Sequence, residues 1–181
     1  MDTEKIQLTL KAAEDLLAPF GFSTHRPADF RLDALIQPTN LLEVVQKITD
    51  TRWGYLSAIT GLDHPGNVSR ELGDRQWRQQ EQNPSEDRER DGSIELMYHF
   101  SKGAAVLTLH VWVTYTNPGV PSVSNLIPSA VYYEVEAAEM FGVKFRNLPT
   151  KEEHLLLPDD WPQNTYPLRK SFTGLKETAK N

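Results

Sequence analysis

Three glutamates lie close together in one short segment of the chain. Glu134, Glu136 and Glu139 fall within a stretch of helical character, and residues three apart on a helix are neighbours. A close pair of carboxylates can act as a general acid and base or bind a metal ion. A solvated or ion-paired helix face has the same composition, and Arg169 and Lys170 are available as its partners. The sequence leaves both interpretations open and favours the second.

The histidines give little indication of a catalytic or metal centre. None of the five follows an HxH or HExxH pattern, and His99 and His110 are placed to face each other on a polar sheet surface. The sequence also lacks a G-x-S-x-G motif, a Gly-rich phosphate loop and a cysteine nucleophile. Asp159-Asp160 has no calcium-loop spacing. We therefore expect no catalytic, cofactor-binding or metal-binding residues.

The composition excludes several classes of protein. The 181 residues contain no cysteine, so we expect neither disulfides nor thiolate-bound zinc or iron–sulfur clusters. The net charge of −6 argues against a nucleic-acid partner. No apolar run approaches the ~18 residues of a membrane span, and the first residues do not resemble a signal peptide. These features predict a soluble cytoplasmic protein with no direct membrane span, which could still be peripheral to a membrane through its partners.

The first part of the chain alternates helical and strand patterns. Apolar residues at helical spacing predict a helix over 3–18, and alternation predicts a strand over 30–37. A second helix follows Pro38-Thr39-Asn40, which is placed to cap it, and 53–62 predicts another strand. The stretch 63–92 has mixed charge and few apolar residues, so it predicts a long exposed loop.

A hairpin and a third helix complete the predicted domain. Alternating apolar residues predict strands over 94–100 and 107–115, with one face against helices and the other partly polar. The third helix runs to Phe141, and Gly142 suits the left-handed position that ends it. Residues 1–145 are thus predicted to form an α+β domain, with helices packed on one side of a mainly antiparallel sheet.

Residues 146–181 form a tail with no helical or strand period. Its prolines at 149, 158, 162 and 167 each remove a backbone donor and disfavour helix at the preceding residue. Its large apolar residues are Leu155, Leu156, Leu157, Trp161, Tyr166, Leu168 and Phe172. Such a tail can wrap back on its own sheet or lie along another protein. We favour the second arrangement and predict an extended, partner-docking tail.

Several motifs resemble the signature of one family. They are Pro121-Ser-Val-Ser-Asn-Leu-Ile-Pro-Ser-Ala130, Glu134-x-Glu136-x-x-Glu139-x-Phe141-Gly142-Val143-x-Phe145, Leu155-Leu-Leu-Pro-Asp-Asp-Trp161 and Pro167-Leu168-Arg169-Lys170. These segments resemble the 30 kDa subunit of respiratory complex I, NADH:quinone oxidoreductase. The resemblance covers about 53–172 apart from the polar loop, and the residues before it are collinear.

The resemblance implies a cofactor-free subunit of the peripheral arm of complex I. It would pack against the 49 kDa-type quinone-site subunit and support electron transfer to quinone coupled to proton translocation. It would lie on the cytoplasmic side of the energy-transducing membrane. The signature and partner-docking residues would be Glu134, Glu136, Glu139, Phe141, Gly142, Phe145, Trp161, Pro167, Leu168, Arg169 and Lys170. Among them Trp161 would anchor the tail, and Arg169 could pair with a partner carboxylate.

Departures from the signature leave the branch of the superfamily open. Val135 stands in place of its arginine, Glu139 in place of its aspartate, and Leu148 and Tyr166 in place of histidines before proline. Related subunits occur in energy-converting membrane hydrogenases and formate hydrogenlyase-type complexes. The alternative to a complex I subunit is therefore the equivalent subunit of one of those complexes. The third hypothesis is a free-standing enzyme that uses Glu136 and Glu139.

Overall fold

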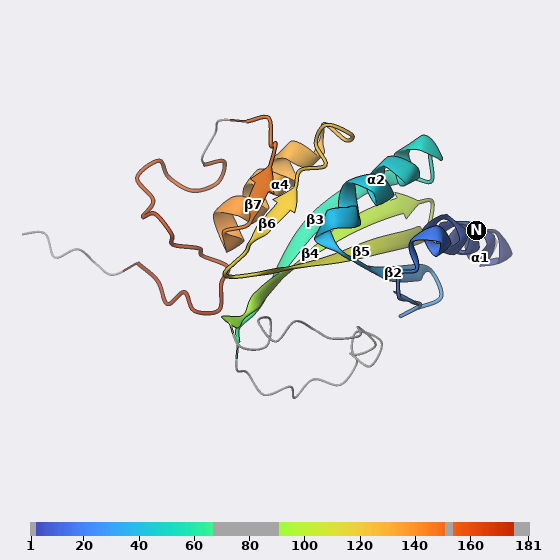
Figure 1. Cartoon of the computed structure of the whole chain (residues 1–181), viewed down its shortest axis with the longest axis horizontal. Helices are drawn as coiled ribbons and strands as arrows, with labels where there is room; N and C mark the ends of the chain where they lie inside the picture. The colour runs from blue at the N-terminus through green and yellow to red at the C-terminus, as the bar shows by residue number, and fades with distance from the viewer. Residues whose placement is uncertain (1–2, 67–90, 151–153, 176–181) are drawn as a thin grey trace, which may run out of the picture.

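A five-stranded sheet lies at the centre of the molecule, in the order β1-β2-β5-β4-β3 (Figure 1). The computed structural model describes residues 3–66, 91–150 and 154–175. The strands are β1 Thr24–His25, β2 Arg31–Ile36, β3 Tyr55–His64, β4 Ser93–Lys102 and β5 Ala105–Thr114. β2 and β5 pair in parallel, whereas the other three pairings are antiparallel. The predicted mainly antiparallel sheet is therefore confirmed, with one parallel pair added.

The helices pack on one face of this sheet. They are α1 Thr3–Leu17, α2 Leu41–Asp50 and α4 Ala130–Phe141, with short 3-10 turns at Ala18–Phe20 and Pro38–Asn40. Alternate residues of the hairpin, such as Leu96, Tyr98 and Leu109, are fully buried in one cluster with Leu10 of α1 and Val44 of α2. The α+β class is thus confirmed, because the period-2 and period-3.6 apolar patterns meet in a single core.

Local chain geometry differs from the predictions at two places. Asn40 makes no side-chain cap, because it already lies in the helical region at the end of a 3-10 turn. β3 extends to His64, so the predicted exposed loop begins later than 63, and Asp63 is only 2% exposed. The rest of that loop, 67–90, lies outside the described residues.

A second, two-stranded sheet was not predicted. β6 (Gly119–Pro121) pairs in parallel with β7 (Lys144–Arg146), on the two sides of α4 in the sequence. Strands of three residues show no alternation over enough positions to be seen in a sequence. The pairing fixes both ends of the segment that carries α4, and with it the start of the tail.

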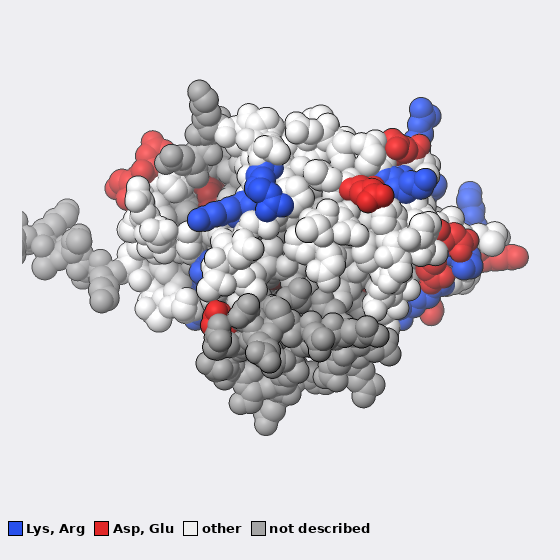
Figure 2. Space-filling view, in the orientation of Figure 1, with Lys and Arg blue, Asp and Glu red and all other residues white. Residues whose placement is uncertain are grey.

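Charged side chains are unevenly distributed over the face seen in Figure 2. Both signs gather at the α1 end, where Lys11 pairs with Asp15 at 2.7 Å and Arg26 with Glu14 at 2.7 Å. Most of the centre of this face is uncharged (Figure 2). Exposed pairs of this kind contribute about 1 kcal/mol or less each, so their main effect is on solubility.

Candidate docking site at the C-terminal end of α4

The first glutamate of α4 is held inside the fold. Glu134 is fully buried and accepts hydrogen bonds from Ser122 Oγ at 2.6 Å and Val123 N at 2.7 Å. Burial raises the pKa of Glu134, and these two hydrogen bonds offset only part of that rise. Glu134 therefore fixes the turn after β6 to the helix.

Glu139 and Glu136 have different surroundings although they are three residues apart. Glu139 is 6% exposed, and its carboxylate accepts the backbone N–H of Leu155 and, at 3.0 Å, that of Leu156. His154 Nδ1 lies 3.4 Å from the same carboxylate. Glu136 is exposed. The two carboxylates therefore do not share a site, and the acid–base hypothesis loses its geometric basis.

The helix ends as predicted, and the tail covers its end. Gly142 has φ +75° and donates its N–H to Ala138 O, which is the left-handed end of a helix. A Cβ at Gly142 would lie 2.5 Å from Cζ of Tyr166, so the absence of a side chain lets the tail approach. The Phe141 ring similarly occupies the space above Gly61 of β3. Glycine is needed at both places for close packing.

Arg169 binds its own domain. Its Nε donates to Phe141 O at 2.8 Å, and its guanidinium lies 4.5 Å from the ring centre of Tyr115 and 4.4 Å from that of Tyr166. A cation there satisfies a free carbonyl at a helix C-terminus and stacks on two aromatic faces. This role within the chain accounts for Arg169 Nε, and the pairing of Arg169 with a partner carboxylate stays a prediction.

A buried aspartate holds the next residue of the tail. Asp63 accepts the Tyr115 hydroxyl hydrogen through Oδ1 and the Lys170 N–H at 2.7 Å through Oδ2. Burial and the hydrogen bond to Asp63 together raise the pKa of Tyr115. Sequence reasoning did not single out Asp63 or Tyr115.

The remaining tail residues form turns. Trp161 Nε1 donates to Thr165 O at 2.8 Å, and the Trp161 ring lies 6.1 Å from that of Phe172. Pro167 precedes Leu168, whose N–H donates to Met140 O at 3.2 Å. The apolar side chains that point to solvent are Leu155 (40% exposed), Leu156 (60%), Leu168 (54%) and Leu175 (51%). Phe145 of β7 is partly buried against the core.

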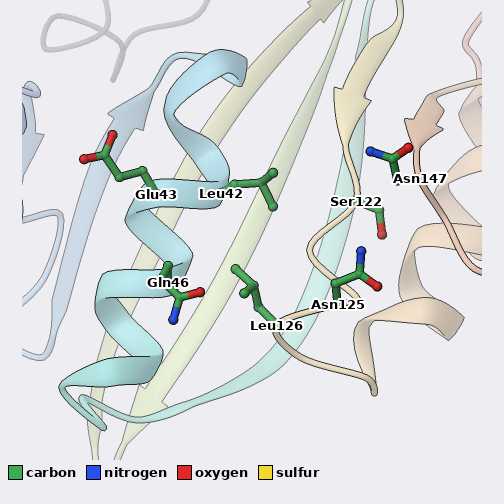
Figure 3. A pocket seen from close by; sticks show the side chains of 7 residues that line it. All are labelled: Leu42, Glu43, Gln46, Ser122, Asn125, Leu126 and Asn147. Atoms are coloured by element: carbon green, nitrogen blue, oxygen red, sulfur yellow. The ribbon is translucent and has the colours of Figure 1, made fainter.

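A shallow pocket of ≈ 350 Å³ lies away from the tail, between α2 and the segment after β6 (Figure 3). Leu42 and Leu126 extend into it. Of the described residues that line it, Ser122 is the one with a hydroxyl, and that hydroxyl donates to Glu134. This hydroxyl is held inside the fold, because Ser122 is only 3% exposed and Glu134 is fully buried.

His99 and His110 lie on the polar face of the sheet. His99 contacts the hydroxyls of Thr60 at 2.9 Å and Thr108 at 3.2 Å, and burial lowers its pKa. His110 Nδ1 lies 2.7 Å from Glu95. Burial alone would lower the pKa of His110, but hydrogen bonds to carboxylates raise it above its ordinary value. Among residues 3–66, 91–150 and 154–175, no three His, Asp or Glu side chains are arranged to hold a metal ion.

Comparison with known proteins identifies the family. The family model described as "Respiratory-chain NADH dehydrogenase, 30 Kd subunit" matches residues 34–178. The chain belongs to this family. It is 29% identical over 160 residues to an NADH-quinone oxidoreductase subunit of Roseiflexus sp. (strain RS-1), an alignment that covers 84% of this chain and 77% of that protein. It is 39% identical over 150 residues to formate hydrogenlyase subunit 5 of Escherichia coli (strain K12), covering 81% of this chain but 22% of that protein.

Two solved structures share the fold. A trypsin-resistant fragment of Nqo5 superposes with a TM-score of 0.58 at 17% identity, over 78% of this chain and 98% of that chain. The membrane-bound sulfane sulfur reductase, an archaeal respiratory membrane complex, contains a chain with a TM-score of 0.65 at 19% identity, over 90% of this chain and 84% of that one. In the described part of this 30 kDa-family chain, no helix is long and apolar enough to cross a membrane.

Proposed function

We propose that this chain is a cofactor-free peripheral-arm subunit of a complex I-like NADH:quinone oxidoreductase. It would support electron transfer to quinone, coupled to proton translocation, by holding the arm together. The observation that carries the proposal is the family match over 34–178, which includes β3, β4, β5, α4 and most of the tail. The proposal agrees with the absence of cysteine from the 181 residues and with signature carboxylates that are used inside the fold.

The proposed neighbour is the 49 kDa-type quinone-site subunit, and the proposed contact is the tail. Leu155, Leu156 and Leu168 present apolar side chains to solvent while their main-chain N–H groups are held by the domain. Apolar side chains that are exposed together on a fixed backbone mark a candidate contact surface for another protein. Such a subunit would be peripheral, on the cytoplasmic side of the energy-transducing membrane.

Co-purification of the other members of the complex tests the proposal. A tagged full-length chain is expected to recover a quinone-site subunit and iron–sulfur subunits from solubilised membranes, as identified by mass spectrometry. Leu156→Asp with Leu168→Asp should lose them, whereas Leu8→Asp on α1, where the side chain is 66% exposed, should not. A truncation should end at Thr150, because an end at or before Arg146 would cut into strand β7 or its last residue's connection to the tail.

The opposite results would refute the proposal in distinct ways. Recovery of the full-length chain alone would argue against a subunit role. Equal recovery by the Leu156/Leu168 and Leu8 variants would keep the subunit role and reject the tail as the contact. Loss of NADH-driven quinone reduction in membranes that lack the chain, with recovery on complementation, would support the complex I assignment.

The equivalent subunit of a formate hydrogenlyase-type or energy-converting hydrogenase complex is the second candidate. The 39% identity to formate hydrogenlyase subunit 5 favours it, and it exceeds the 29% identity to the Roseiflexus relative. The large subunit that co-purifies separates the two candidates. Nickel-binding cysteines in that partner, and formate- or hydrogen-linked activity lost with this chain, would support the hydrogenase branch.

A further inference from the structure

Two buried carboxylates from different elements hold the main chain of the tail. Glu139 of α4, whose side chain is 1% exposed, accepts the N–H groups of Leu155 and Leu156. Asp63, at the end of β3 and 2% exposed, accepts the N–H of Lys170 at 2.7 Å. A buried carboxylate is costly without donors, and a proline-rich segment cannot satisfy its own N–H groups in a helix or sheet. The carboxylates therefore supply acceptors for the N–H groups of the tail, and the tail supplies the donors that the buried carboxylates need.

The end of α4 adds contacts between these two points. Leu168 N donates to Met140 O at 3.2 Å, and Arg169 Nε donates to Phe141 O at 2.8 Å. These carbonyls belong to the last turn of the helix, where the helix itself provides no partners. The Tyr166 ring meanwhile covers Gly142. The segment 154–172 is thus fixed at both of its ends and returns to the same helix terminus.

We propose that Asp63 and Glu139 form a clasp that orders residues 154–172 in the free chain, before any partner binds. The clasp presents Leu155, Leu156 and Leu168 in the positions in which they dock. The docking half of this inference rests on the proposed function. Preorganisation strengthens binding because the segment loses its conformational entropy when the chain folds, so association does not carry that cost. Glu139 and Asp63 are positioning residues in this scheme, and neither contacts the partner.

Hydrogen exchange in the isolated full-length chain tests the clasp without a partner. The N–H groups of Leu155, Leu156 and Lys170 should be protected in the unmodified chain. Glu139→Gln removes the charge and one acceptor oxygen, so exchange at 155 and 156 should rise by about ten- to a hundredfold. Glu136→Gln, an exposed glutamate three positions earlier on the same helix, should leave these rates unchanged.

A second variant keeps the test independent of Glu139. Asp63→Asn should speed exchange at Lys170 and leave the centre of α4 protected, which also shows that the domain is folded. Exchange of the tail N–H groups at unprotected rates in the unmodified chain would overturn the clasp. Equal exchange in the Glu136 and Glu139 variants would also overturn it.

Partner capture then separates the clasp from the function. With the variants folded, the apparent affinity of Glu139→Gln for the co-purifying quinone-site subunit should fall about tenfold, and that of Glu43→Gln, an exposed glutamate of α2, should not. A protected tail in a chain that captures no such subunit would leave the clasp standing and refute the proposed function. A loosened tail with unchanged affinity would refute preorganisation.

Discussion

Replacing Gly142 by alanine tests how closely the end of α4 and the tail depend on each other. Gly142 has φ +75° and ψ 29°, and the tail ring of Tyr166 occupies the space where a side chain would lie. The chain contains a matched control. Gly21 has φ +66° and ψ 25°, but nothing lies within 4 Å of a Cβ placed there. Alanine at either position meets the same backbone strain, and only at Gly142 does it meet another residue.

The two costs can be separated by subtraction. A left-handed alanine costs about 1–2 kcal/mol, which is the expected loss for Gly21→Ala. Overlap with a packed ring adds about 1–3 kcal/mol, so Gly142→Ala should lose about 2–5 kcal/mol in all. For a chain of this length each kcal/mol lowers the melting temperature by about 2–4 °C. Gly142→Ala should therefore melt about 2–12 °C below Gly21→Ala.

Urea unfolding and hydrogen exchange measure the difference together. The Tyr166 ring can also escape the overlap by moving with the tail, which would reduce the difference in unfolding free energy. In that case the N–H groups of Leu168 and Lys170 should exchange faster in Gly142→Ala than in Gly21→Ala. Equal stability together with equal exchange in the two variants would refute the packing of the tail on Gly142.

Three further predictions concern Arg169, Gly61 and His110. Arg169→Lys keeps the charge but loses the planar group between two tyrosine rings and the Nε hydrogen bond, so thermal unfolding should show a loss of about 1–2 kcal/mol. Gly61→Ala places a Cβ against the Phe141 ring and should cost about 1–3 kcal/mol, which Phe141→Leu should partly relieve in a double-mutant cycle. The raised pKa of His110 means that it stabilises the fold fully below its ordinary value of 6.5, and that this contribution is lost as pH rises through the folded-state pKa. His110→Gln should therefore show less decline of unfolding free energy between about pH 6 and pH 9 than the unmodified chain, and an equal decline would contradict the assignment.

The sequence predicted those features that depend on neighbours along the chain. The hairpin follows from alternation at 94–100 and 107–115, and the end of α4 follows from a glycine at Gly142. Both are local, because strand pairing across a short turn and a left-handed helix end involve residues within a few positions. The family motifs were likewise readable, since each is a run of adjacent residues.

Which carboxylates are buried and hydrogen-bonded depended on the tertiary structure. Glu136 and Glu139 have the same side chain on the same helix, yet one is exposed and the other is covered by the tail. Asp63 and Lys170 are separated by 107 positions in the sequence and still form a hydrogen bond. The burial and hydrogen bonding of a carboxylate depend on the residues that pack over it. In this chain those residues come from segments that are distant in the sequence. Local residue patterns therefore determined the elements, and the resemblance of its motifs indicated the family. Only the folded chain decided which carboxylates hold the tail, because that depends on which distant segments pack together.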